Sequence, residues 1–482
     1  MSLKRRALRG ATWAVAGGNA SQVLSFIMFI AISRVVGPAA FGTVAVAIGI
    51  VELCRPLASE AVVGNLVARG RVEAEAFDAG FALSIGLALV LCAALVVGAP
   101  LFAIVFRTPD LAHVLPQLAV LLLFYAGCRV QEAHLTIELR FGSLAVRTVL
   151  AALIGGGVGI LAAYAGFGVE ALVLQQWTAA AVSLILLWIA CPWRPRLPRS
   201  REHLRALMRE SAALAPAGLV AQLSLLTDAM AVASFFGPAA AGLYNLGKRV
   251  RLALQLGLST ALDRVSLPTF ARVRSDPQQL ARTLETALRL STLVAFPMFI
   301  GVAAIAPDLI ALFLGPAWTE AAAPLTLLLV GGAVTMTTHY FDNILLVLDH
   351  RRWIILLRVL MLTLLGAALL LFGRAGPAHV AACALIAAFA HNLAGFTTVS
   401  RLARIPARTY LVGVLLPLGI SLAMLALVTL ARDALVARAL PGFVRLGLLV
   451  ALGALFYLSI SWALARPAMR AAISAARTVL AR

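Results

Sequence analysis

The protein has 482 residues, of which 62% are hydrophobic and 12% are charged, and its formal net charge is +20. Soluble domains usually carry about 25% charged residues, so this composition excludes an ordinary soluble domain. The cations lie in short segments between apolar blocks and not on one basic face, which argues against a nucleic-acid partner.

Apolar blocks long enough to span a bilayer recur along the whole chain. The first follows Lys4, Arg5, Arg6 and Arg9, and it is too long for the apolar core of a signal peptide, so we interpret it as a membrane helix. The sequence thus predicts an all-α polytopic membrane protein with about 14 transmembrane helices. The predicted helices cover residues 11–33, 41–63, 79–106, 111–135, 144–165, 169–191, 210–235, 241–263, 287–314, 321–347, 353–373, 377–399, 410–431 and 443–465.

The positions of Lys and Arg predict the orientation of these helices. Most of the cations fall in the N-terminal segment, in the even-numbered connections and in the C-terminal tail, so both termini are predicted to be cytoplasmic. Of the longer cytoplasmic connections, 264–286 contains Asp276 followed by Pro277, a typical helix start. The segment that follows is predicted to lie as a helix on the membrane surface.

An internal repeat divides the predicted helices into two sets. The motif Gly-Pro-Ala-Ala-x-Gly at residues 37–42 recurs at residues 237–242, and weaker matches follow in the same order. The sequence predicts a six-helix lobe over 1–200, a second over 201–409, and two further helices with a cytoplasmic tail over 410–482. Because each lobe has an even number of spans, the two repeats are predicted to be parallel.

Cations within the predicted membrane helices are costly to bury and therefore informative. Lys248, Arg249 and Arg251 lie in the predicted helix 241–263 with no acidic residue within one turn, and Arg55 and Arg129 lie in the predicted helices 41–63 and 111–135. We predict that these five cations line a hydrated cavity. The alternative is that Arg55 and Arg129 form structural ion pairs with the acids three residues away.

Four acidic residues within predicted membrane helices are candidates for energy coupling: Asp228, Asp342, Glu52 and Glu132. Apolar surroundings favour uptake of a proton by a carboxylate, so these acids could respond to a proton or sodium gradient. The alternative assigns them to structural pairs, for example between Asp228 or Asp342 and Lys248 or Arg249. No P-loop, Gly-x-Ser-x-Gly motif or metal-spaced cluster occurs in the sequence, so neither a cofactor nor an ATP-driven pump is predicted.

Two stretches of sequence resemble a known family. One runs from Arg34 through the Gly-Pro-x-x-Phe-Gly turn to Gly42, and the other contains Pro268, Phe270, Arg272, Phe296, Pro297, Gly315 and Trp318. Both are similar to the polysaccharide transporters of the multidrug/oligosaccharidyl-lipid/polysaccharide exporter superfamily.

The resemblance implies a function. The chain would be a flippase of the bacterial inner membrane that moves undecaprenyl-diphosphate-linked oligosaccharides to the periplasmic leaflet by alternating access, for O-antigen, capsule or exopolysaccharide. The five cations would hold the diphosphate. A polysaccharide polymerase and a chain-length regulator would be further partners, beside the membrane lipid itself.

Three other functions remain open at this point. A multidrug exporter of the same superfamily would suit an acidic cavity better than the basic helix 241–263. A flippase for the peptidoglycan lipid precursor has the same number of helices and a cationic cavity. A membrane polysaccharide polymerase or ligase belongs to a different class, and the short outward connections of this chain argue against such an enzyme.

Overall fold

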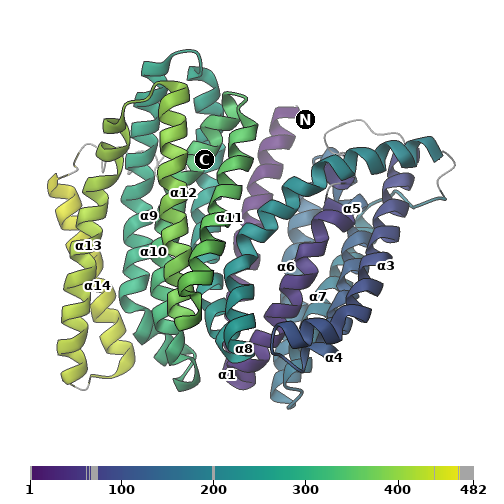
Figure 1. The fold of residues 1–482 in the computed structure, drawn as a ribbon, viewed down its shortest axis with the longest axis horizontal. Helices are drawn as coiled ribbons and strands as arrows, with labels where there is room; N and C mark the ends of the chain where they lie inside the picture. Colours follow the sequence, from purple (N-terminus) through teal and green to yellow (C-terminus); the bar gives the residue numbers. More distant parts are fainter. Residues whose placement is uncertain are drawn as a thin grey trace. The chain divides into compact units, whose positions relative to one another are not determined.

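The computed structural model describes residues 3–60, 62–64, 66, 74–197, 201–438, 440–464 and 466, and the predicted tail beyond lies outside this range. These residues are almost entirely helical and contain no strand (Figure 1). The elements in chain order are α1 (Leu3–Arg55), η1 (Pro56–Glu60), α3 (Ala74–Val105), α4 (Leu111–Ala119), α5 (Leu121–Ile137), α6 (Phe141–Tyr164), α7 (Val169–Ala190), α8 (Arg201–Val273), α9 (Pro277–Phe313), η2 (Pro316–Ala321), α10 (Ala322–Val347), α11 (Arg351–Phe372), η3 (Gly373–Ala375), α12 (Pro377–Ala403), α13 (Ala407–Ala437) and α14 (Gly442–Leu464).

Within the described residues, 12 helices are long and apolar enough to cross a membrane. Two of them, Ala20–Gly64 and Ala215–Ser259, have 45 residues each, which is about twice the length that a bilayer core requires. Each is broken by one glycine, Gly37 with φ 80° and Gly237 with φ 79°. Each break divides a long helix into two spans, so the predicted all-α polytopic fold with 14 spans is confirmed.

The two copies of the Gly-Pro-Ala-Ala-x-Gly motif explain these breaks. Gly37 and Gly237 adopt a positive φ that residues with a side chain avoid, and the proline that follows starts the next helix without requiring an N–H partner. The last glycine of each copy packs on the backbone of the other copy. A Cβ on Gly42 would overlap the Pro238 carbonyl oxygen, and one on Gly242 would overlap that of Pro38.

This close approach predicts a specific sensitivity to a single methyl group. We expect Gly42→Ala to lower the free energy of unfolding by about 1–3 kcal/mol, because the overlap is with backbone that cannot rotate away. Thermal unfolding of the purified protein in detergent measures the effect. Gly86→Ala is the matched control, because a Cβ at this position in α3 meets nothing within 4 Å. Equal melting temperatures for the two variants would contradict the expectation.

The chain divides into two compact units, Met1–Gly242 and Leu243–Arg482, which we call unit 1 and unit 2. This division falls inside α8, whereas the repeat predicts a lobe boundary at residue 200, and the repeat-based domains stay a prediction. In unit 1, α6 packs between α1 and α7. In unit 2, α9 packs against α10 and α13, and α12 packs against α10 and α11.

Helix α9 corrects one prediction. Asp276 caps the helix as expected, because its side chain accepts the N–H groups of Gln278 at 2.9 Å and Gln279 at 3.1 Å. The helix then continues without interruption from Pro277 to Phe313, so a separate surface helix is wrong. Its apolar face, with Leu280, Leu284 and Leu288, is buried in the core of unit 2 and not presented to lipid.

The helices α13 and α14 are tied to α9 by one buried carboxylate, Asp308. Its Oδ2 is 2.6 Å from Nε of Arg432 in α13, and its Oδ1 is 2.6 Å from Nε of Arg445 in α14. A hydroxyl adds a further link, because Tyr457 of α14 donates to the carbonyl oxygen of Leu293 in α9 at 2.9 Å. The two C-terminal helices are therefore part of unit 2 and not a loose addition.

Candidate functional site

The candidate site begins where α1 changes into the π-helical segment η1. Pro56 has no N–H, so it cannot make the α-helical bond to the carbonyl oxygen of Glu52, four residues earlier. The five residues Pro56–Glu60 continue as a π-helix, in which residues five apart lie above one another. Arg55 and Glu60 are thereby brought to the same side, and the Arg55 Nη2 lies 2.7 Å from the Glu60 Oε1.

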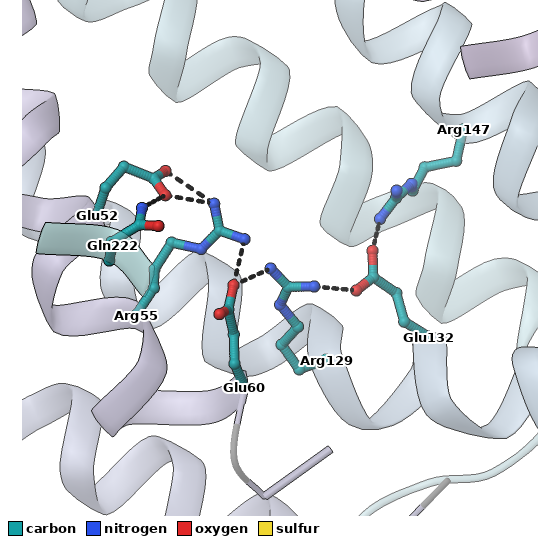
Figure 2. Close-up of polar contacts among 7 residues, drawn as sticks. All are labelled: Glu52, Arg55, Glu60, Arg129, Glu132, Arg147 and Gln222. Atoms are coloured by element: carbon teal, nitrogen blue, oxygen red, sulfur yellow. Dashed lines mark hydrogen bonds and ion pairs between the residues drawn. The ribbon is translucent and has the colours of Figure 1, made fainter. Parts of the chain in front are cut away.

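A continuous chain of charged and polar contacts runs through unit 1 from this point (Figure 2). Nη1 of Arg55 donates to both carboxylate oxygens of Glu52, at 2.8 and 2.6 Å, and the side-chain amide of Gln222 donates to Glu52 at 3.3 Å. On the other side, Nη2 of Arg129 is 3.5 Å from the same oxygen of Glu60. Glu60 therefore joins two arginines that belong to different helices.

The chain continues from Arg129 into α6. Nη1 of Arg129 donates to Glu132 at 3.0 Å, and Arg147 of α6 contacts the second oxygen of the same carboxylate (Figure 2). Three arginines alternate with three glutamates, so the formal charges balance. Five of these six side chains are 17–23% exposed, whereas Glu60 is 43% exposed. Glu60 is therefore the member whose contacts solvent weakens most.

A cavity of about 390 Å³ opens beside this chain of contacts. The Arg55 guanidinium lies 5.2 Å from the centre of the Tyr125 ring, a distance typical of a cation–π contact. The remaining lining is mostly polar or small. The cavity is lined by Arg55, Tyr125, Cys128, Arg129, Glu132, Arg147, Thr148, Ala151, Gln176, Ala179, Ala180 and Ser183. It combines guanidinium donors, carboxylates, hydroxyls and an aromatic ring, the groups that recognise phosphates and sugars.

The structure thus places two of the five predicted cations, Arg55 and Arg129, on one cavity of unit 1. Both also form the ion pairs that were the alternative interpretation. The other three lie on the part of α8 that belongs to unit 2. Lys248 is buried, Arg249 is exposed and Arg251 is partly buried, with an Nε that has no hydrogen-bond partner within the described part of the chain.

The four predicted coupling acids fall into two groups. Glu52 and Glu132 belong to the chain of contacts in unit 1. Asp228 is buried in α8 and accepts the N–H of Ala229 at 2.8 Å. In unit 2, Asp342 lies 3.7 Å from Arg358. This pair joins an acid of one helix to an arginine of the next helix, as Glu132 and Arg147 do in unit 1.

Three residues of these pairs were missed in the sequence. Glu60 lies five positions after Arg55, a spacing that an α-helix places on a different face, so only the π-helical segment brings them together. Arg147 and Arg358 lie in the first turns of predicted helices, at ends that the distribution of cations predicts to be cytoplasmic. Arg147 follows Arg140 at the same spacing as Arg358 follows Arg351. This match between the two halves of the sequence could have indicated that Arg147 and Arg358 have a common role.

Comparison with known proteins places the chain in a family. A family model described as polysaccharide biosynthesis protein matches residues 31–323. The chain is 24% identical over 313 residues to the succinoglycan biosynthesis transport protein ExoT of Rhizobium meliloti, an alignment that covers 65% of this chain but only 63% of ExoT. It is 23% identical over 334 residues to the lipopolysaccharide biosynthesis protein WzxC of Escherichia coli, with 69% and 68% covered.

Solved structures show the fold. The lipid II flippase MurJ in an inward closed conformation aligns with a TM-score of 0.78 over 95% of this chain and 99% of MurJ, at 14% identity. An inward-facing multidrug resistance MATE family transporter of the MOP superfamily aligns with a TM-score of 0.56 over 84% of this chain and 97% of that one, at 15% identity. The family match covers more than half of the sequence, and the resemblance found in the sequence is confirmed: the chain is a multi-pass membrane protein that belongs to the polysaccharide biosynthesis protein family and shares the fold of MOP-superfamily transporters.

Proposed function

We propose that this chain is a flippase that moves undecaprenyl-diphosphate-linked oligosaccharide repeat units from the cytoplasmic to the periplasmic leaflet of the bacterial inner membrane. The observation that carries the proposal is the exposed Glu60 carboxylate held between Arg55 and Arg129 at the cavity of unit 1. The names of ExoT and WzxC, a transport and a biosynthesis protein for polysaccharides, support the substrate class. The fold shared with a lipid II flippase supports the reaction.

In this proposal the diphosphate takes the place of Glu60. Glu52 and Glu132 already hold Arg55 and Arg129 in position, so the entering phosphate need not order these side chains. Of the three glutamates, Glu60 is displaced at the smallest cost, because this carboxylate is 43% exposed and contacts to exposed charges are weakened by solvent. Arginine presents a planar fork of donors that fits phosphate oxygens, and the returning carboxylate of Glu60 would assist release.

Unit 2 contains an apolar cavity of its own. It has a volume of about 670 Å³, lies between α9, α13 and α14 and is lined almost entirely by apolar residues, among them Leu293, Met424 and Leu449. Burial of apolar surface gives about 25 cal/mol per Å², so this cavity suits a lipid chain.

Energy coupling remains part of the proposal. Each of Glu52, Glu132 and Asp342 has an arginine partner, so uptake of a proton by the carboxylate would release that arginine to the substrate. Asp228 is buried and is proposed as a further acceptor. A proton or sodium gradient would then drive transport by changing these pairings.

Opposite effects of two substitutions test the displacement of Glu60. With undecaprenyl diphosphate as the probe and purified protein in detergent, we expect Arg129→Ala to weaken binding about tenfold. Glu60→Gln should instead tighten binding, by up to about fivefold, because the competing carboxylate is gone. Arg205→Ala, at an exposed position of α8, is the control for loss of one cation. Weaker binding by Glu60→Gln would show that this carboxylate has a structural role, and the displacement would be wrong.

The competing functions are separated by the choice of substrate in proteoliposomes. Flipping of an undecaprenyl-diphosphate oligosaccharide, with little flipping of lipid II and no export of a cationic dye, supports the proposal. Preference for lipid II would assign the chain to the peptidoglycan pathway, and dye export alone would assign it to multidrug transport. Cleavage or elongation of the saccharide would indicate an enzyme.

A further inference from the structure

A second cavity that contains charged residues lies in unit 2, outside the residues proposed to bind the transported lipid. It has a volume of about 450 Å³ and is formed by the first turns of α9 and by the connection from α12 to α13. Arg282 contributes from α9, Arg404 from the connection and Arg408 from α13, together with one acid, Glu285. Three cations and one anion leave this cavity with an excess of positive charge.

The three guanidinium groups are available to a ligand. All three arginines are exposed, and no ion pair or hydrogen bond joins any of their side chains to another group in the described part of the chain. The first N–H groups of α9 are already satisfied by Asp276, so the attraction for an anion comes from the arginine side chains and not from the helix end.

The backbone of Arg404 gives this cavity a further peculiarity. Arg404 ends α12 in the left-handed conformation, with φ 54° and ψ 39°, a position at which glycine is the usual residue. A residue with a Cβ in this conformation is strained by about 1 kcal/mol relative to glycine. Arg404 therefore contributes its side chain to the cavity although its left-handed backbone conformation favours glycine.

The position along the helices indicates what kind of anion reaches the cavity. Arg408 lies three residues before the long apolar stretch 411–431 of α13, and Arg282 lies in the polar first turns of α9, which precede the apolar part that follows Arg289. Residues at the ends of apolar membrane helices lie at the level of lipid headgroups. The distribution of cations predicts that this end faces the cytoplasm, where basic pockets between helices bind anionic headgroups.

We propose that this cavity binds the phosphate of an anionic phospholipid headgroup, as a site separate from the transport cavity of unit 1. The phosphate would take bidentate contacts from two of the three arginines, and the hydroxyl of Thr409, which also lines the cavity, would donate to a third oxygen. The site does not depend on the function proposed above.

Native mass spectrometry of the purified protein tests the site with phosphatidylglycerol as the probe and phosphatidylcholine as the neutral comparison. We expect the triple variant Arg282→Gln, Arg404→Gln, Arg408→Gln to retain at least tenfold less phosphatidylglycerol than the unaltered protein. The control of equal charge is the triple variant Arg272→Gln, Arg274→Gln, Arg351→Gln, at exposed positions that do not line the cavity. Equal retention by the two triple variants would overturn the site.

Two further experiments separate loss of binding from loss of folding, and binding of a lipid headgroup from binding of a free phosphate compound. Arg404→Gly removes one cation while relieving the left-handed backbone, so this variant should melt no lower than the unaltered protein and yet bind phosphatidylglycerol several-fold more weakly. Unchanged binding would show that Arg404 has only a structural role. Soluble glycerol phosphate at the same concentration should not displace the lipid. Displacement at comparable concentrations would assign the site to a free phosphate compound and overturn the lipid assignment.

Discussion

Replacing Asp308 by alanine should strongly destabilise unit 2. The variant leaves Arg432 and Arg445 next to one another, partly buried and without their shared carboxylate, which lies 2.6 Å from each. Removal of one partner from a buried ion pair costs about 3–5 kcal/mol, chiefly because the remaining charge is desolvated without compensation. We expect a melting temperature lower by several degrees and a smaller yield of folded protein after extraction from the membrane.

Arg432 provides the matched control for this experiment. It also lies 3.7 Å from Asp433, an acid that is 78% exposed. Asp433→Ala removes an ion pair to the same arginine but should change the free energy of unfolding by about 0–1 kcal/mol. Combining Asp308→Ala with Arg432→Leu and Arg445→Leu should recover most of the lost stability. If Asp308→Ala melts at the same temperature as Asp433→Ala, the buried carboxylate does not hold α13 and α14 to α9.

The second large effect is expected at Glu132, whose two carboxylate oxygens contact Arg129 and Arg147. Glu132→Gln keeps the shape of the side chain and removes its charge, so both arginines lose a charge-assisted contact of about 1.5–3 kcal/mol. At equal amounts of protein in proteoliposomes, we expect the rate of lipid-linked oligosaccharide flipping to fall at least tenfold.

A variant of a nearby acid is the control that distinguishes a specific role of Glu132 from a general effect of losing one negative charge. Glu138 follows the same helix, is 42% exposed and contacts His134 and Arg140 only loosely, at 3.6 and 3.8 Å. Glu138→Gln should therefore leave flipping near its original rate. Comparing rates across pH adds a second readout. If protonation of Glu132 couples transport to a proton gradient, Glu132→Gln should also flatten the pH dependence. A rate equal to that of Glu138→Gln would remove Glu132 from the site.

Most of the fold could be predicted from the sequence, because hydrophobicity over about 20 residues is a local signal. The breaks at Gly37 and Gly237 were also accessible, since a repeated Gly-Pro pair indicates a helix break followed by a helix start. The surface helix after Asp276 was predicted wrongly. An amphipathic segment covers either lipid headgroups or the protein core, and the pattern of one segment does not distinguish the two.

The candidate site was predictable only where its contacts are local. The pairs of Glu52 with Arg55 and of Arg129 with Glu132 are three residues apart on α-helices, so spacing alone suggested them. Contacts that depend on how helices pack were not accessible. The clearest case is Asp308, because its two partners lie more than 100 residues further along the chain. Glu60 was hidden for another reason, since its contact with Arg55 depends on a π-helical turn.

That π-helical turn makes one proline as important as the charged residues around it. Pro56 has no N–H to donate to the Glu52 carbonyl oxygen, and the segment Pro56–Glu60 continues as a π-helix. In a regular α-helix Glu60 would lie about 140° around the axis from Arg55, on a different face of the helix. Substitution of Leu57 or Ala58 would leave the π-helical geometry intact. Natural variation should therefore be freer at positions 57 and 58 than at Pro56.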